Sequence, residues 1–323
     1  MILCANMTNL PGDLNRFEGR EDFARFCRQH GLDGVELLPL GGDALGWLPP
    51  QAVMGVHLTF QPSWLDFWRG DEAAVAAEFG SLEAAYGVFG GRSPQALPQA
   101  LRRDLRLAQG LGARYAVCHV SNVTLEECVT YRFTHSDEAV CQGAAEVISQ
   151  ALEGLDLSLD FLVENLWWPG FTLTRPQLTR ALLRAIPAPR KGIMLDLGHL
   201  MHTCLDLEDQ QQALDYLYRC LERHGGPQGD VKGVHLHQSL TGDYVKAMTE
   251  KGVGLRGDYG RRAGQVYRHI LRIDRHRPFC HPGVGDLIAQ LAPRYLTYEF
   301  ITRDRAQWER FLRRQNRALD RLP

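Results

Sequence analysis

The stretch KGIMLDLGH, residues 191–199, begins with a short apolar run and ends with polar residues. Its length and its β-branched and aliphatic content are typical of a buried strand. Asp196 closes the run, and His199 follows three residues later. A buried strand that serves only for packing seldom ends in an acid and a histidine. Other apolar runs that end in the same way would indicate a shared site.

Seven further runs along the chain are also apolar and of strand length, which gives eight predicted strands: MILCAN, GVELLPL, MGVHLTF, RYAVCHV, DFLVENL, KGIMLDLGH, KGVHLHQ and YLTYEF. Amphipathic stretches lie between most of them and predict helices: REDFARFCRQHG, ALPQALRRDLRLAQGLG, SDEAVCQGAAEVISQALEG, TRPQLTRALLRAI, LEDQQQALDYLYRCLERHGG and RDRAQWERFLRRQNRALD. This alternation predicts an α/β fold, a single (β/α)8 TIM barrel over residues 1–323. An open doubly wound sheet is the rival, but the first strand lacks the glycine fingerprint of that fold.

Two connections are longer than the others. One follows VHLTF and runs through QPSWLDFWRGDEAAVAAEFGSLEAAYGVFGGRS, and the other spans residues 238–273. In a barrel they leave the carboxyl ends of strands three and seven, on the face where active sites are built. We therefore expect extended loops there that serve a substrate.

The composition of the chain bears on its partners and on its place in the cell. The chain has 45% hydrophobic and 23% charged residues and a net charge of −2, which gives no bulk reason to expect nucleic acid or a membrane as partner. Eight cysteines are scattered without a CxxC pair, so neither a zinc ribbon nor a disulfide framework is indicated. The apolar start is too short for a signal peptide, and no run reaches membrane-spanning length. We expect a cytoplasmic protein.

Most of the predicted strands end in residues that bind metals: His57, His119, Glu164, Asp196 with His199, His235 and Glu299. Taken singly, each such residue is more often a hydrogen-bonded structural residue than a ligand. Together, however, they would bury several charges at one mouth, and a bound cation is the simplest compensation. Mixed imidazole and carboxylate ligands favour Zn, Mn, Fe or Co over Ca. The sequence therefore predicts a divalent metal site.

The series resembles the xylose-isomerase-like barrel superfamily, which includes sugar isomerases and epimerases and the endonuclease IV class. The four positions common to much of that superfamily are Glu164, Asp196 in a DxxH, His235 and Glu299. The endonuclease IV class is similar at further positions, including an Asp-Arg-His in LRIDRHRPFCH, residues 271–281. Those positions are His57, His119, His199, Asp274 and His276.

This resemblance implies one to three divalent ions per chain. One would be held by His57 and His119, with Glu164 bridging to a second ion. The second would be held by Asp196, His235 and Glu299, and the third by His199, Asp274 and His276. The implied activity is hydrolysis of a phosphoester, in which Glu164 positions the nucleophile.

The substrate implied by the class is DNA, but this chain departs from the class. Glu164 is followed by NLWWPG, the long connection after strand three carries aromatic residues, and no concentrated Lys/Arg loop is seen. Nucleic acid is thus possible but not favoured, and we expect a small-molecule phosphodiester. Trp167 and Trp168 are candidate substrate contacts as an aromatic wall, and ordinary packing is the equal alternative.

An alternative belongs to another reaction class. In a sugar isomerase or epimerase, one ion would chelate the substrate while Glu164 and Glu299 act as the acid and base pair. Arg277 with PGVG resembles a substrate-binding loop of that branch. His237 lies two residues beyond His235, on the same side of the strand, and is expected behind the ligands or against the substrate. A non-enzymatic scaffold predicts that metal-ligating residues have been lost, and none of the expected ones is lost.

The number of bound ions, three against one, distinguishes the phosphoesterase from the sugar isomerase or epimerase.

Overall fold

The computed structural model describes residues 1–40, 47–226, 229–252 and 254–320. Eight parallel strands form a closed barrel in chain order, which confirms the TIM barrel. The strands are β1 (Ile2–Thr8), β2 (Gly34–Leu38), β3 (Val53–His57), β4 (Tyr115–His119), β5 (Asp160–Glu164), β6 (Lys191–Asp196), β7 (Val231–Leu236) and β8 (Tyr295–Tyr298). Because β1 pairs with both β2 and β8, the sheet closes on itself, and the open doubly wound alternative is excluded.

The alternation of side chains along each strand separates two cores. Residues that point outward, such as Phe161 and Val163 of β5, join the large core between the barrel and its helices. Inward-pointing residues fill the barrel in a layer made of Tyr115, Val117, Leu162, Met194 and Tyr295. Gly55 leaves the space that the ring of Tyr115 takes, because a Cβ there would overlap that ring. The barrel is therefore packed below its mouth.

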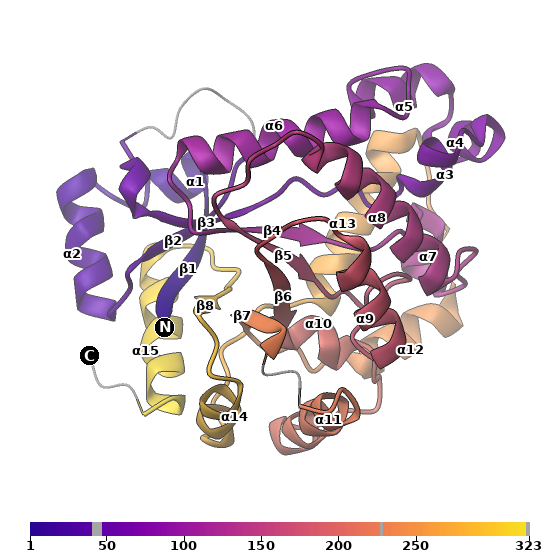
Figure 1. Cartoon of the computed structure of the whole chain (residues 1–323). Coiled ribbons are helices and arrows are strands. Elements are labelled where there is room, and N and C mark those ends of the chain that lie inside the picture. Colours follow the sequence, from indigo (N-terminus) through magenta and orange to yellow (C-terminus); the bar gives the residue numbers. More distant parts are fainter. Residues whose placement is uncertain (41–46, 227–228, 253, 321–323) are drawn as a thin grey trace.

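Helices surround the strands (Figure 1). The predicted helices are present as α2 (Arg20–His30), α6 (Ala96–Gly110), α8 (Asp137–Leu152), α9 (Pro176–Ala185), α11 (Gln210–Arg223) and α15 (Arg305–Ala318). Capping residues mark the ends of these helices. α2 ends before Gly31, which has a left-handed φ of 67°. α8 begins after Ser136, whose side chain accepts a hydrogen bond from the backbone N–H of Ala139. Short elements complete the part before β3 and around β4 and β6: α1 (Pro11–Leu14), the 3-10 turn η1 (Pro50–Ala52), α7 (Leu125–Thr130) and α10 (Leu197–His202).

The two long connections are helical, which the expectation of extended loops did not include. The first holds α3 (Leu65–Arg69), α4 (Glu72–Phe79) and α5 (Leu82–Phe89), and the second holds α12 (Gly242–Lys251) and α13 (Tyr259–Ile273). The segment HPGVG, residues 281–285, leads into α14 (Gly283–Leu291). Among the described residues, no helix combines the length and the apolarity needed to cross a bilayer.

Candidate metal centre

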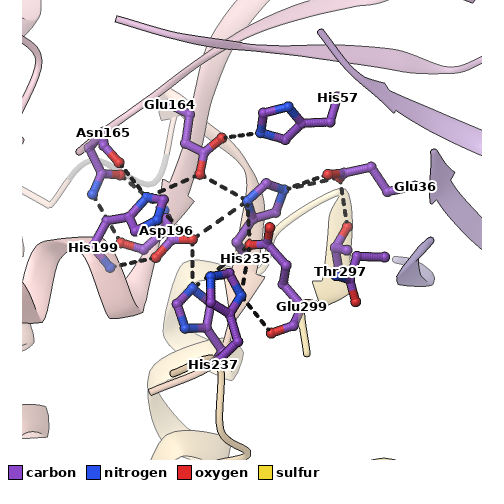
Figure 2. Close-up of polar contacts among 12 residues, drawn as sticks. Glu36, His57, Glu164, Asn165, Asp196, His199, His235, His237, Thr297 and Glu299 are labelled. Carbon is purple, nitrogen blue, oxygen red and sulfur yellow. Dashed lines mark hydrogen bonds and ion pairs between the residues drawn. The ribbon is translucent and has the colours of Figure 1, made fainter. Parts of the chain in front are cut away.

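The mouth of the barrel gathers the polar residues that end the strands. The side chains that point into the barrel are apolar in the packed layer and polar at the carboxyl ends of the strands. On β5 Leu162 is followed two residues later by Glu164, and on β6 Met194 is followed by Asp196. His199 comes from the first turn of α10, where its backbone N–H donates to Asp196 Oδ1 at 2.6 Å. Strand periodicity and one helix start thus place these side chains within reach of one another (Figure 2).

Asp274 and His276 reach the same mouth from the segment after α13. Backbone hydrogen bonds of 2.8 Å and 3.0 Å between Gln238 and Arg277 pin this segment to the end of β7. His276 has a left-handed φ of 46°, which is uncommon for a residue other than glycine. Such strain is retained mainly where the surrounding contacts fix the backbone, and here it accompanies a candidate ligand.

The first group of candidate ligands consists of His57, His119 and Glu164. The two Nε2 atoms of the imidazoles lie 3.1 Å apart, and each lies 3.0–3.1 Å from Glu164 Oε2. Ligand atoms around a tetrahedral ion with bonds of about 2.0–2.1 Å are separated by about 3.3 Å. The three atoms are therefore arranged as ligands of a single small cation would be.

The second group consists of Glu164, Asp196, His235 and Glu299. Nδ1 of His235 lies 3.1 Å from Glu164 Oε1, 3.1 Å from Glu299 Oε2 and 3.7 Å from Asp196 Oδ2. Glu299 Oε2 makes no hydrogen bond among the described residues despite this short contact. A buried carboxylate oxygen that is close to a donor atom but not hydrogen-bonded to it is expected where both atoms are ligands of one cation.

The third group consists of His199, His237, Asp274 and His276. Asp274 Oδ2 lies 2.6 Å from His276 Nε2 and 3.3 Å from His199 Nε2. The rings of His237 and His276 stack with centroids 3.9 Å apart. His237 also joins this group to the second one, since its Nε2 lies 2.8 Å from Asp196 Oδ2.

The second nitrogen of several of these imidazoles is hydrogen-bonded, which fixes the orientation of the ring. His57 Nδ1 lies 3.0 Å from Leu58 O, and His276 Nδ1 lies 3.1 Å from Glu299 O. His235 Nε2 lies 3.0 Å from the carboxylate of Glu36. The sequence prediction missed Glu36, although a single acid inside the apolar run GVELL of β2 was a signal for it.

Opposite charges hold the carboxylates of this centre in their ionised form. Burial alone would raise the pKa of Glu164, but the charges of His119 and His235 lower that pKa well below its usual range. Burial would likewise lower the pKa of His276, and Asp274 with Glu299 raises it to about 9. Because ligating imidazoles must be neutral, a cation entering these groups would release protons.

The donor atoms fit divalent transition metals. All three groups combine imidazole nitrogen with carboxylate oxygen, which suits Zn, Mn, Fe or Co. The side chains of these groups are buried or nearly so. The buried His/Asp/Glu clusters are thus consistent with divalent metal sites.

A cavity of about 350 Å³ opens above the three groups. Part of its wall is aromatic, from Phe60, Trp167, Trp168 and Tyr267. Trp167 lies 4.4 Å from Trp168 and 5.1 Å from His199, measured between ring centroids. Tyr267 is 63% exposed at the rim, and no Lys or Arg is found among the described lining residues.

The structure brings together all nine predicted ligand positions: His57, His119, Glu164, Asp196, His199, His235, Asp274, His276 and Glu299. Their role as ligands stays a prediction. His237, predicted as a substrate contact or supporting residue, lies inside the third group. Arg277 does not reach the cavity lining. Its guanidinium packs 5.3 Å above the ring of Phe311 on α15, because the pairing with Gln238 leaves the side chain on the outside.

The chain matches the family described as Xylose isomerase-like TIM barrel over residues 24–292. It belongs to that family. A search of curated proteins found no match.

Solved structures of the same fold come from several enzymes. A putative xylose isomerase from Rhodospirillum rubrum ATCC 11170 shares 12% identity at a TM-score of 0.52, covering 100% of this chain and 98% of that one. The structure described as AsfvAP:AG shares 11% identity at a TM-score of 0.53, covering 99% and 98%. Endonuclease IV from Thermus thermophilus shares 18% identity at a TM-score of 0.49, covering 100% of both chains. These likenesses concern the fold.

Proposed function

We propose that the protein is a metal-dependent phosphoesterase that acts at a trinuclear centre. The observation that carries the proposal is the position of Glu164, whose two oxygens contact different groups. Oε2 lies against His57 and His119, while Oε1 lies 3.1 Å from His235 Nδ1. A carboxylate in this position is suited to bridge two cations, as clustered metal sites for phosphoryl chemistry require.

The residues outside the second group support three ions over one. A single ion on the second group would leave Asp274 among His199, His237 and His276 with no cation to hold. These four buried side chains combine three imidazole nitrogens with one carboxylate oxygen, a donor set that suits a divalent transition metal. The order of these residues along the chain also resembles that of the endonuclease IV class.

Bound divalent ions would supply charge neutralisation for phosphoryl oxygens and would acidify a water molecule. The residues of the chain do the rest. Glu164 fixes the spacing of two groups, and Glu36 holds the ring of His235 in place. Trp167 and Phe60 give the cavity an apolar wall that excludes bulk water and strengthens electrostatic contacts within it.

The cavity supports a small substrate over duplex DNA. Recognition of a DNA backbone depends on Lys and Arg, and none is among the described residues that line the cavity. The wall is instead aromatic, which suits a phosphodiester or phosphomonoester that carries a ring. We therefore propose a ring-bearing metabolite or nucleotide-like compound as substrate.

One observation favours the isomerase or epimerase alternative. Glu164 and Glu299 both lie 3.1 Å from Nδ1 of His235, so two carboxylates flank one point as an acid and base pair would. In that enzyme a single ion is needed. The number of ions therefore separates the two functions.

The test is the metal content per chain, measured by plasma emission on protein purified without chelator, for the native protein and for His276→Ala. We expect about three equivalents and a loss of about one in the variant, because His276 belongs to only one group. Hydrolysis of bis(4-nitrophenyl) phosphate should fall with the metal content.

His135→Ala is the matched control, since His135 is paired with Asp66 and is not in any of the three groups. It should keep the native metal content. A single equivalent that His276→Ala leaves unchanged would overturn the trinuclear phosphoesterase and would make the isomerase the working function.

A further inference from the structure

A second cavity lies between the end of β4 and the helices α5, α6 and α8. Its volume is about 310 Å³, at the lower end of the range of small-molecule sites. The walls are apolar and include Trp64, Phe89, Leu97, Leu101, Val147 and Ile148. The cavity is partly open to solvent, so a small molecule can enter it from the surface.

Small residues on two helices keep the hollow open. Ala100 on α6 and Ala144 on α8 line it, at positions where a larger apolar side chain would fill the space. The acid at its edge is already used: Asp104 Oδ2 accepts a hydrogen bond from the backbone N–H of Thr59 at 3.1 Å. The lining also includes Thr59, Gln61 and Arg103, and most of the remaining surface that the cavity offers to an occupant is apolar.

Two residues are shared by the walls of this cavity and of the cavity above the candidate metal centre. Phe60 and His119 line both cavities, and their rings meet edge to face with centroids 4.8 Å apart. His119 Nε2 lies 3.0 Å from Glu164 Oε2. Its Nδ1 is buried and has no hydrogen-bond partner among the described residues, in contrast with the second nitrogen of His57, His235 and His276.

We infer that the second cavity takes an aryl group of the substrate whose phosphoester lies at the candidate metal centre. An aryl group matches the apolar walls and can stack against Trp64 and Phe60, since aromatic pairs gain energy beyond the area they bury. Phe60 and His119 would then lie beside the ester oxygen that joins the aryl group to the phosphorus. The inference rests on the proposed function in taking this group to be part of the substrate.

Binding of 2-naphthyl phosphate to the metal-loaded protein, followed by polarisation of the naphthyl emission, tests the inference. Ala100→Leu should weaken binding about tenfold or more, because the new side chain fills the cavity. Gln99→Leu places the same side chain on the exposed side of α6 and should bind as the native protein does. Methyl phosphate, which has no aryl group, should displace the probe from native protein and from Ala100→Leu with the same affinity.

The probe 2-naphthol separates this inference from the proposed function, because it has no phosphate. Saturable binding of 2-naphthol that Ala100→Leu weakens supports the cavity even if no phosphoester is hydrolysed. Equal binding of 2-naphthyl phosphate by the native protein and Ala100→Leu would overturn it, even if hydrolysis is observed. Should Ala100→Leu fail to fold, Leu101→Ala enlarges the cavity and should shift the preference from phenyl to naphthyl phosphate, and an unchanged preference would again contradict the inference.

Discussion

Glu36 supports the candidate metal centre from behind. Its carboxylate accepts hydrogen bonds from Tyr115 Oη at 2.8 Å and from Thr297 Oγ1 at 3.0 Å, and it lies 3.0 Å from His235 Nε2. These contacts orient the imidazole so that Nδ1 faces Glu164. An anionic partner also makes a ligating imidazole more basic and thus a better donor to a cation.

Glu36→Gln should weaken metal binding about 10- to 100-fold without loss of the fold. The amide keeps the shape of the side chain but removes the charge behind His235. Competition with a chromogenic chelator measures the affinity, and circular dichroism checks the fold. Glu72→Gln, at an exposed position on α4, is the control and should leave the metal affinity unchanged. Native affinity in Glu36→Gln would show that the carboxylate does not tune the ligand.

At this scale strand periodicity predicts the candidate ligands at the strand ends, whereas Asp274 and His276 are predicted from a resemblance. His57, His119 and Glu164 are predictable because each ends an apolar run, and the run fixes the direction of the side chain. Glu36 lies inside a run, where the acid itself stands out in the sequence but its partner His235 cannot be inferred. Arg277 was assigned by a resemblance between short loops, but the pairing of its backbone with Gln238 turns the side chain away.

Among the elements, α10 approaches β7 more closely than an ordinary side chain permits. Gly198 lies on α10, and a Cβ at this position would overlap the ring of His237. A glycine inside a helix costs about 0.5–1 kcal/mol relative to alanine, so its presence here needs a compensating contact. The close approach allows His237 to reach Asp196, which ties the helix to the third group.

Gly198→Ala should destabilise the protein by about 1–3 kcal/mol, because the methyl group forces the His237 ring aside. It should also lower the metal content by about one equivalent. Gly87→Ala is the matched control: this glycine lies within α5, and a Cβ there meets nothing within 4 Å. The control should gain up to about 1 kcal/mol in urea unfolding. Two variants of equal stability would contradict the close approach.

Strands and long amphipathic helices were predictable as elements because their periodicity extends over enough residues. The short α3, with five residues, carries too few turns for its pattern to be distinguished from a loop. α13 places Gly260 and Gly264 in its first half, which lowers its helix propensity, and its packing against α7 and α12 compensates. Tertiary contacts that bring distant segments together are the part that a sequence pattern does not contain.

Over the whole molecule, the last helix closes the structure against the first part of the chain. α15 packs beside α2 (Figure 1), and Arg305 on α15 lies 2.5 Å from Asp22 on α2. The hydrogen bond from Arg305 lowers the pKa of Asp22 to about 2. An Asp in an unfolded chain has a pKa of about 3.9, so this pair stabilises the fold wherever the pH is above that value.

Asp22→Asn should cost about 1 kcal/mol of unfolding free energy at pH 7, a value that allows for solvent screening of the pair. The difference from the native protein should shrink as the pH falls from about 4 towards 2, because the native carboxylate then becomes protonated as well. Urea unfolding at pH 7, 4 and 3 measures both. Asp215→Asn, at an exposed position on α11, should show no such trend. If the unfolding free energies of the native protein and Asp22→Asn differ by the same amount at every pH, the ion pair of Asp22 with Arg305 does not stabilise the fold as described.

The apolar layer of Tyr115, Leu162, Met194 and Tyr295 also restricts access to the candidate metal centre. It blocks the axis of the barrel beneath the mouth, so there is no route straight through the protein. A substrate and its product would therefore both pass through the face on which the strands end. A product that stays bound there would compete with the next substrate molecule for the same site.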